Sequence, residues 1–147
     1  MVKRSAGLDV GDRRIGVAVS DPLALTAQPV GVVERSKLAL DIAKVMGLLA
    51  DYPLERFVLG LPLQLDGREG TQAERIRKFG NALEKATGLS VVYQDERLTT
   101  VQGERVLVDA GMSRVRRRGV IDKLAAVLIL QAYLDRLTPP IGSGGQD

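Results

Sequence analysis

Three acidic residues, Asp9, Glu96 and Asp122, occupy positions where packing alone would not place a charge. Each lies within or at the edge of an apolar segment, and a buried carboxylate is costly unless it is paired or binds a metal. The chain contains no His and no Cys, so carboxylates are almost the only side chains left for metal chemistry. Because oxygen ligands suit hard cations, the three residues predict a shared site for Mg²⁺ or Mn²⁺.

The missing residue types exclude several classes of enzyme. Without Cys the chain has no disulfide, no thiol nucleophile and no thiolate zinc site. Without His it has no Ser-His-Asp triad and no histidine-based zinc site of the protease type. No apolar run approaches the roughly 20 residues that span a bilayer. The beginning of the chain shows no secretory cleavage site, so we expect a cytoplasmic protein that makes no use of a membrane.

Basic residues gather near two of the acidic positions. The net charge is only +3, from 21 Lys and Arg against 18 Asp and Glu. Such clusters beside metal-binding carboxylates suit a polyanionic substrate, although a solvated basic loop is the alternative. Aromatic residues make up only 3% of the chain, which argues against a base-stacking platform. The candidate nucleic-acid-binding residues are Arg13, Arg14, Arg114, Arg116, Arg117, Arg118 and Lys123.

The first 20 residues predict a β-hairpin that positions Asp9. Residues 3–10 and 14–20 both alternate between large apolar and small or polar side chains, and 11–13 form the turn. Asp9 then shares a face with Gly7 and neighbours Gly16 or Ala18. Small residues around a carboxylate leave a shallow floor that a large ligand can approach, although they could equally serve only to tolerate twist.

The rest of the chain predicts alternating strands and helices. The pattern indicates an α/β fold with a mixed five-stranded sheet and helices on both faces. In such sheets, sites gather at the carboxyl ends of central strands. The expected elements are a strand at 28–34, a helix at 36–52 capped by Ser36, a strand at 56–60, a helix at 71–87 capped by Thr71 and ended by Gly88, a strand at 91–94, a helix at 99–109, a basic loop at 111–119, and a buried helix at 120–137.

A glycine-rich loop precedes the helix expected at 71–87. Backbone N–H groups of Gly67, Gly70 and Thr71 could bind a phosphate there, and a plain connection is an equal alternative. We expect residues 1–137 to form a single domain. The Gly- and Pro-rich tail, residues 138–147, is expected to be disordered.

Four sequence blocks resemble the YqgF/RuvX family, in family order. The resemblance runs from about residue 5 to residue 137 and implies a ribonuclease H-like fold related to Holliday junction resolvases. That family is described both as a junction resolvase and as a nuclease that matures the 5′ end of pre-16S ribosomal RNA. The blocks are Gly7-Leu8-Asp9-Val10-Gly11 with Arg14-Ile15-Gly16-Val17-Ala18, Gly60-Leu61-Pro62-Leu63 with Asp66-Gly67, Asp95-Glu96-Arg97-Leu98-Thr99-Thr100, and Ile121-Asp122-Lys123-Leu124-Ala125-Ala126.

The resemblance implies that Asp9, Glu96 and Asp122 are the catalytic, metal-binding residues. The hypothesis is that Asp9 bridges two ions while Glu96 and Asp122 each complete one, as suits in-line displacement at phosphorus. Related resolvases carry a fourth acidic or His ligand one helical turn after the last Asp. Here Ala125 and Ala126 stand at those positions, which points to a weak nuclease or to one that needs a partner.

The expected function is therefore a metal-dependent endonuclease acting on structured RNA or branched DNA. Ribosomal precursor particles are candidate partners, and the protein would act as a monomer or a homodimer. One alternative is a non-catalytic nucleic-acid-binding protein on a nuclease-like fold. A second is a phosphotransferase of the actin and sugar-kinase type, for which a single domain of this length is short.

Overall fold

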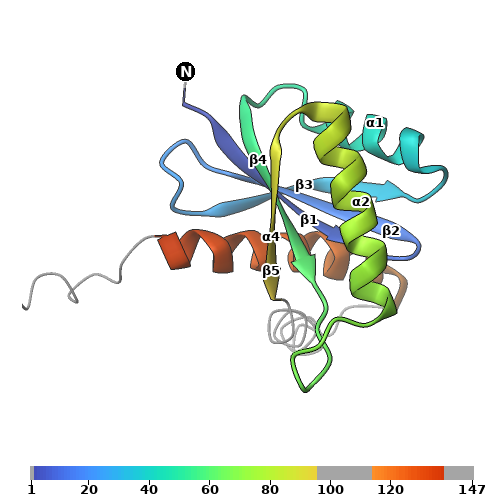
Figure 1. Ribbon diagram of the computed structural model, residues 1–147. Helices are drawn as coiled ribbons and strands as arrows, with labels where there is room; N and C mark the ends of the chain where they lie inside the picture. Colours follow the sequence, from blue (N-terminus) through green and yellow to red (C-terminus); the bar gives the residue numbers. More distant parts are fainter. Residues whose placement is uncertain (1, 96–113, 138–147) are drawn as a thin grey trace, which may run out of the picture.

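The computed structural model describes residues 2–95 and 114–137, and the side chains of these residues outside 114–123. Strands and helices alternate after an initial run of three strands, as the sequence predicts (Figure 1). The elements are β1 (Arg4–Val10), β2 (Arg14–Ser20), β3 (Ala27–Glu34), α1 (Leu38–Leu48), β4 (Leu54–Leu61), α2 (Thr71–Thr87), β5 (Ser90–Asp95) and α4 (Arg114–Leu137).

The strands form one mixed five-stranded sheet in the order β3-β2-β1-β4-β5. Strand β1 lies at its centre, antiparallel to β2 and parallel to β4, and β4 is in turn parallel to β5. Strands β1, β4 and β5 therefore end at the same edge of the sheet. The predicted mixed sheet is confirmed, and this shared edge is where the chain would assemble a site.

Helices cover both faces of the sheet, as predicted (Figure 1). Helices α1 and α2 pack on one face, over a core that includes Leu8, Ile15 and Phe57. Helix α4 packs on the other face, where Ala18 and Val58 belong to the buried cluster. The alternation predicted for the first hairpin is thus confirmed, because successive residues of β1 and β2 belong to opposite faces.

The start of α1 differs from its predicted form. The helix begins at Leu38 and ends at Leu48, and Ser36 does not cap it. Instead, the Ser36 backbone N–H donates a 2.8 Å hydrogen bond to the carboxylate of Asp41, which is fully buried. Ser36 therefore donates a hydrogen bond to the helix instead of accepting one, because the side chain of Asp41 in the first turn points back toward the residues that precede the helix.

Helix α2 also begins differently from the prediction. Its N-cap is Gly70, whose carbonyl accepts the Glu74 N–H at 3.1 Å, and Thr71 is already helical. The predicted end is confirmed: Gly88 adopts a left-handed conformation with φ of 74°, which glycine accepts without strain.

Helix α4 is longer than predicted, and the basic loop expected at 111–119 is wrong for residues 114–119. These residues form the first turns of the helix, because Arg is a good helix former and one glycine costs only about 1 kcal/mol in a helix of 24 residues. The helix is also not buried on all sides, since Val127 and Leu128 are half-buried while Ala126 and Ile129 are buried. Only one face of α4 packs against the sheet.

Some predictions fall outside the described residues, namely the helix expected at 99–109 and the tail at 138–147. Across the described ranges, no helix is both long and apolar enough to cross a membrane.

Candidate functional site

Asp9 lies at the carboxyl end of the central strand, one residue before β1 ends. It is half-buried and stands on the face covered by α4, the same face as Gly7. Its partner in the neighbouring strand is Gly16, one of the two neighbours, Gly16 or Ala18, that the hairpin pattern predicts. The carboxylate therefore sits over a strand neighbour that has no side chain, at the edge where three parallel strands end.

A row of residues crosses the sheet at the level of Asp9. Gly16 lies on one side of it. On the other side, the register of β1 and β4, extended by one residue beyond its last pair, brings Gly60 level with Asp9. Gly60 in turn pairs with Gln94 of β5. All four residues belong to the α4 face, so two polar side chains share a row in which the other two positions are glycine.

Gln94 is a residue of this row that the sequence analysis missed. Its side chain is 8% exposed, and its amide oxygen has no hydrogen-bond partner within the described part of the chain. A buried polar atom without a partner costs free energy and calls for a functional explanation. The signal that could have found it is the polar residue at an inward-facing position of β5, two residues before Glu96 and on the same alternation.

Helix α4 crosses directly over β1 beside this row. A Cβ added to Gly7 would lie 3.0 Å from the carbonyl oxygen of Ala126, so only glycine allows the helix so close. Farther along the helix, the Gln131 side chain accepts a 2.9 Å hydrogen bond from the Ala27 N–H, at the opposite edge of the sheet. The helix therefore runs from the edge where β1 ends toward the edge where β1 begins.

This direction places position 122 of α4 at the Asp9 edge. Asp122 precedes Ala126 by four residues, about one helical turn, on the side away from Gln131. Its side chain and the whole of Glu96 lie outside the described residues. Glu96 directly follows Asp95, the last residue of β5, at the same edge. Asp95 itself is exposed and out of phase with buried Gln94, in keeping with its omission from the predicted site.

The donor set at this edge suits a hard divalent cation. Asp9 contributes a carboxylate and Gln94 a buried amide oxygen, and both atom types are ligands that Mg²⁺ and Mn²⁺ accept. Within the described side chains no three metal-ligating groups cluster, and two of the three predicted carboxylates are not among those side chains. The amide oxygen of Gln94, which has no hydrogen-bond partner among the described residues, is the observation that fits a bound ion.

The predicted basic residues lie in two places. Arg13 is exposed in the β1–β2 turn, whereas Arg14 forms an ion pair of 3.2 Å with Glu34 on β3. The remaining five belong to the first turns of α4, where their side chains lie outside the described set: Arg114, Arg116, Arg117, Arg118 and Lys123. Their helical positions precede or adjoin Asp122, at the edge where β1 ends.

The loop between β4 and α2 is a tight turn and not an open cradle. Gly67 has φ of 86°, and its N–H donates to the Gln64 carbonyl at 2.8 Å. The Gln64 N–H donates in turn to Arg68, also at 2.8 Å. Three backbone N–H groups were predicted to hold a phosphate. That of Gly67 already donates within the turn, whereas Gly70 is the N-cap of α2 and Thr71 is its first residue.

Comparison with known proteins identifies the family to which the chain belongs. The model of the RuvX family, described as Holliday junction resolvase, matches residues 3–136. A protein of Heliobacterium modesticaldum named "Putative pre-16S rRNA nuclease" is 52% identical over 132 residues, 90% of this chain and 89% of the relative. A protein of Moorella thermoacetica with the same name is also 52% identical, over 91% of this chain and 96% of the relative.

Solved structures agree on the fold. RuvC of T. thermophilus, in complex with a Holliday junction substrate, superposes with a TM-score of 0.57 at 19% identity, covering 92% of this chain and 96% of that one. The Holliday junction resolvase of fowlpox virus gives a TM-score of 0.56 at 11% identity, covering 92% and 99%. The predicted ribonuclease H-like fold is confirmed, and the names of the relatives favour a nuclease role. The chain belongs to the RuvX family.

Proposed function

We propose that this protein is a metal-dependent endonuclease that hydrolyses phosphodiester bonds in structured nucleic acid. The observation that carries the proposal is the row at the carboxyl end of β1, where Gly60 separates Asp9 from Gln94, whose amide oxygen has no partner among the described residues. Relatives of about half identity named for pre-16S ribosomal RNA make that precursor the leading substrate. A branched DNA junction, the substrate in the family's description, is the second.

Asp9, Glu96 and Asp122 would hold the ion or ions, with Gln94 as an additional oxygen donor. A bound Mg²⁺ or Mn²⁺ supplies Lewis acidity, which makes a water more acidic and withdraws charge from phosphate. Asp9 and Gln94 would orient this group from the floor of the site. The glycines beside Asp9, Gly16 and Gly60, leave room for a phosphodiester backbone to approach the floor.

Positive charge around the same edge would bind the substrate. Arg13 is exposed in the turn that follows Asp9, and the basic first turns of α4 lead to Asp122. Contacts of this kind fix the register of a nucleic acid without reading its sequence, and they make affinity fall with salt. Recognition would therefore depend on the shape of the substrate and, for the ribosomal RNA, on the precursor particle that presents it.

The deciding experiment compares cleavage by the wild type, Asp9→Asn and a control, Asp51→Asn. Asp51 is an exposed carboxylate in the turn after α1, at the other edge of the sheet. The substrates are an RNA spanning the 5′ end of the small-subunit precursor and a four-way DNA junction, each with Mg²⁺, Mn²⁺ or a chelator. We expect metal-dependent cleavage by the wild type and Asp51→Asn, and none by Asp9→Asn.

Two outcomes would change the conclusion. Binding without cleavage by all three proteins would replace the enzyme with a non-catalytic binding protein. Cleavage that survives in Asp9→Asn would remove Asp9 from the site. Where cleavage does depend on Asp9, the preferred substrate decides between precursor processing and junction resolution, and the second activity calls for a dimer that cuts two strands.

A further inference from the structure

A cleft lies on the opposite face of the sheet from Asp9, between the β1–β2 turn, the start of α1 and the first half of α2. Its volume is about 320 Å³. We call it the turn cleft, because the turn between β1 and β2 forms one wall. The residues that line it include Gly11, Asp12, Arg35, Arg75, Ile76, Lys78 and Phe79.

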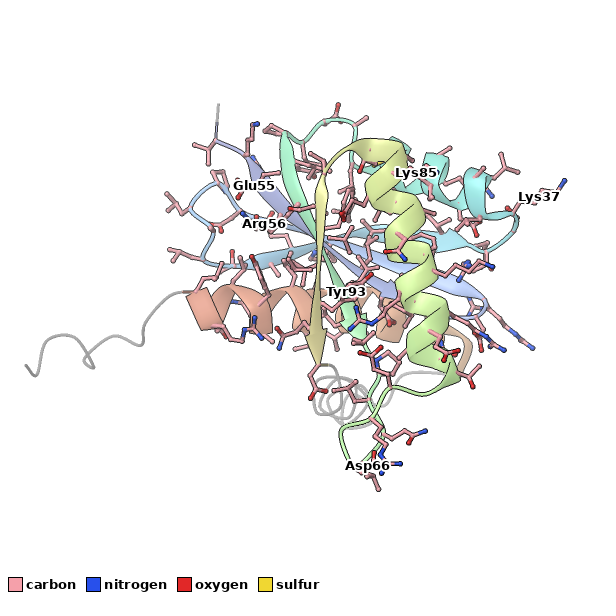
Figure 2. The ribbon with its side chains drawn as sticks, in the orientation of Figure 1. Lys37, Glu55, Arg56, Asp66, Lys85 and Tyr93 are labelled. Atoms are coloured by element: carbon pink, nitrogen blue, oxygen red, sulfur yellow. The ribbon has the colours of Figure 1, made fainter. Side chains whose placement is uncertain are left out.

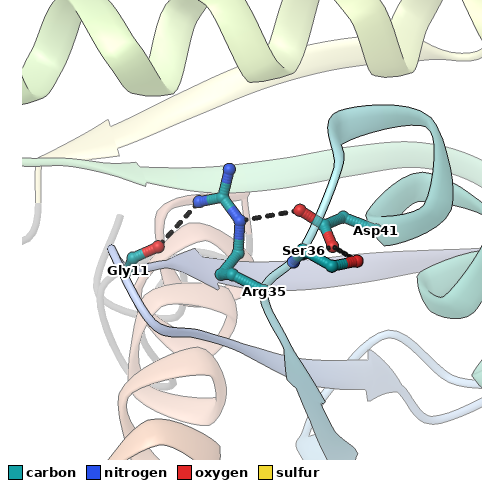
Figure 3. Close-up of polar contacts among 4 residues, drawn as sticks. All are labelled: Gly11, Arg35, Ser36 and Asp41. Atoms are coloured by element: carbon teal, nitrogen blue, oxygen red, sulfur yellow. Dashed lines mark hydrogen bonds and ion pairs between the residues drawn. The ribbon is translucent and has the colours of Figure 1, made fainter.

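Arg35 is fixed at one side of the turn cleft (Figure 3). Its Nε donates to the buried carboxylate of Asp41 at 2.9 Å, and its Nη1 donates to the carbonyl of Gly11 at 2.7 Å. The third nitrogen makes no hydrogen bond among the described residues, and Figure 3 shows it directed away from both partners. A guanidinium held at two corners is pre-organised to donate to an anion from the third.

Two more cations belong to α2 on the other side of the turn cleft. Arg75 and Lys78 are both exposed and three residues apart, so they stand on one face of the helix. Within the described part of the chain, their one acidic contact joins Arg75 to Asp12 at 3.6 Å, between side chains that are 65% and 70% exposed, and a pair of that kind is weak in water. The cations therefore remain available to an incoming anion.

The base of the turn cleft is apolar. Ile76 and Phe79 are each 2% exposed, and the guanidinium of Arg35 lies 5.5 Å from the centre of the Phe79 ring. Cations around the mouth and apolar carbon at the base match the two halves of a nucleotide, an anionic phosphate and a less polar sugar and base. A bare inorganic anion would leave the apolar base uncovered.

The turn cleft adjoins the proposed cleavage site at the edge of the sheet where β1 ends. Asp9 faces α4, whereas Val10 faces the opposite side and lines the turn cleft together with Gly11. Two residues of extended strand span about 7 Å. The phosphates of one nucleic-acid strand recur about every 3.4 Å along the helix axis, so a strand that lies on Asp9 and bends around the edge where β1 ends reaches the turn cleft within a few nucleotides.

We infer that the turn cleft binds a phosphodiester of the strand that is cut at Asp9, a few nucleotides from the scissile bond. The inference rests on the proposed function for the identity of that strand. The turn cleft positions the substrate, and Arg35, Arg75 and Lys78 take no part in the bond cleavage itself. Since the charges contact phosphate, they contribute affinity and salt dependence without sequence preference.

The test is a double charge reversal, Arg75→Glu with Lys78→Glu, measured against a matched double reversal outside the turn cleft. Lys44→Glu with Lys85→Glu changes the net charge equally. Lys85 stands in the last turn of α2, at the opposite end of the helix from the loop that carries Asp66 (Figure 2). Binding of the precursor RNA and of the DNA junction is measured with each pair in an Asp9→Asn background, so that cleavage cannot interfere.

We expect the turn-cleft pair to raise Kd by about tenfold or more, the effect of losing one or two charge-assisted hydrogen bonds. The slope of log K against log salt should fall by about 0.7 for each lost contact to a single strand. The matched pair should stay within about twofold of the parent. With Asp9 restored, the turn-cleft pair should raise KM by a larger factor than it lowers kcat.

Several results would overturn the inference. Equal losses of affinity in both pairs would mean a general charge effect. Unchanged RNA and junction affinity together with phosphate-induced NMR shifts at Arg75 and Lys78 would assign the turn cleft to a small anion. Absence of binding to either nucleic acid by the parent would exclude the strand altogether. Failure of the nuclease function gives a different pattern, in which affinity falls only in the turn-cleft pair while no protein cleaves.

Discussion

Gly7 and Leu130 are in contact at the point where helix α4 crosses the central strand: a Cβ added to Gly7 would lie 2.6 Å from the Cβ of Leu130. The Ala126 carbonyl would be 3.0 Å from the same added atom. Both obstacles are at or next to the helix backbone, so neither can rotate aside. The spacing between α4 and β1, and with it the distance from position 122 to Asp9, depends on a hydrogen atom at position 7.

We expect Gly7→Ala to lower the free energy of unfolding by about 1–3 kcal/mol, the usual cost of overpacking a core. Urea unfolding followed by circular dichroism measures it. The control is Gly47→Ala in α1, where an added Cβ meets nothing within 4 Å. There the better helix propensity of Ala should stabilise the protein by about 0.5–1 kcal/mol. Equal effects of the two substitutions would show that α4 does not rest on Gly7.

We expect the Gln94 side chain to lower the stability of the metal-free protein and to strengthen metal binding. Gln94→Met keeps the approximate shape but removes the buried amide whose oxygen has no partner in the described structure. In chelator the variant should therefore be more stable than the wild type, by on the order of 1 kcal/mol. With millimolar Mn²⁺, the wild type should gain more in Tm than the variant, because one oxygen donor has been lost.

The control for this prediction is Gln28→Met, at an exposed position of β3. It should change neither the stability in chelator nor the response to Mn²⁺. Equal Mn²⁺ responses of the wild type and Gln94→Met would show that the amide does not face the ion.

Asp41 should make the stability of the protein fall in acid. Burial raises the pKa of this carboxyl, but the hydrogen bonds from Ser36 and Arg35 outweigh burial and hold the pKa below its usual value of 3.8. Because the pKa is lower in the folded state, the ionised group stabilises the protein fully above the unfolded value. That contribution is lost as pH falls from there through the folded value.

We therefore expect Asp41→Asn to be less stable than the wild type by about 1–3 kcal/mol at pH 7. The difference should be constant from pH 7 to about pH 5 and should shrink below pH 4. Urea unfolding at a series of pH values measures both proteins. A difference that stays constant down to pH 2.5 would mean that the ionisation of Asp41 does not contribute.

The position of Asp9 could be predicted from sequence because the relevant signal is local. Alternation in two adjacent strands determines which residues face each other, and the short turn determines the register. Gly7 and Gly16 were accordingly placed on the correct face beside Asp9. Helices on both faces of the sheet were also predicted, but the sequence did not indicate which of them covers the face of Asp9.

The place of Gln94 beside Asp9 and the turn cleft could not be predicted in the same way, because both depend on contacts between distant segments. The row from Asp9 to Gln94 requires the registers of β1 with β4 and of β4 with β5. Arg35 was not singled out because its role arises from Asp41, six residues later, and from Gly11, 24 residues earlier. The start of α4 was also misplaced, because Gly119 within a basic run suggested a loop although one glycine does not end a helix of 24 residues.

Arg77 should control the ionisation of Glu69 in the loop that follows β4. The guanidinium makes two hydrogen bonds to that carboxylate, of 2.6 and 2.7 Å, and lies 4.6 Å from the ring centre of Tyr93 on β5. The hydrogen bonds hold the pKa of Glu69 below its usual value of 4.5. Arg77 thus ties the loop to the strand that precedes Glu96.

In Arg77→Met we expect the pKa of Glu69 to rise toward 4.5, because the carboxylate loses its donor. Titration followed by NMR of the Glu69 side chain measures the change. Backbone N–H groups of the loop should exchange faster with solvent in the same variant, since the link to Tyr93 is gone. Arg68→Met is the matched control, because Arg68 pairs with Asp66 and should leave Glu69 unaffected. A Glu69 titration that is the same in the wild type and in Arg77→Met would show that the pair does not persist in solution and that the loop is held by its backbone turn alone.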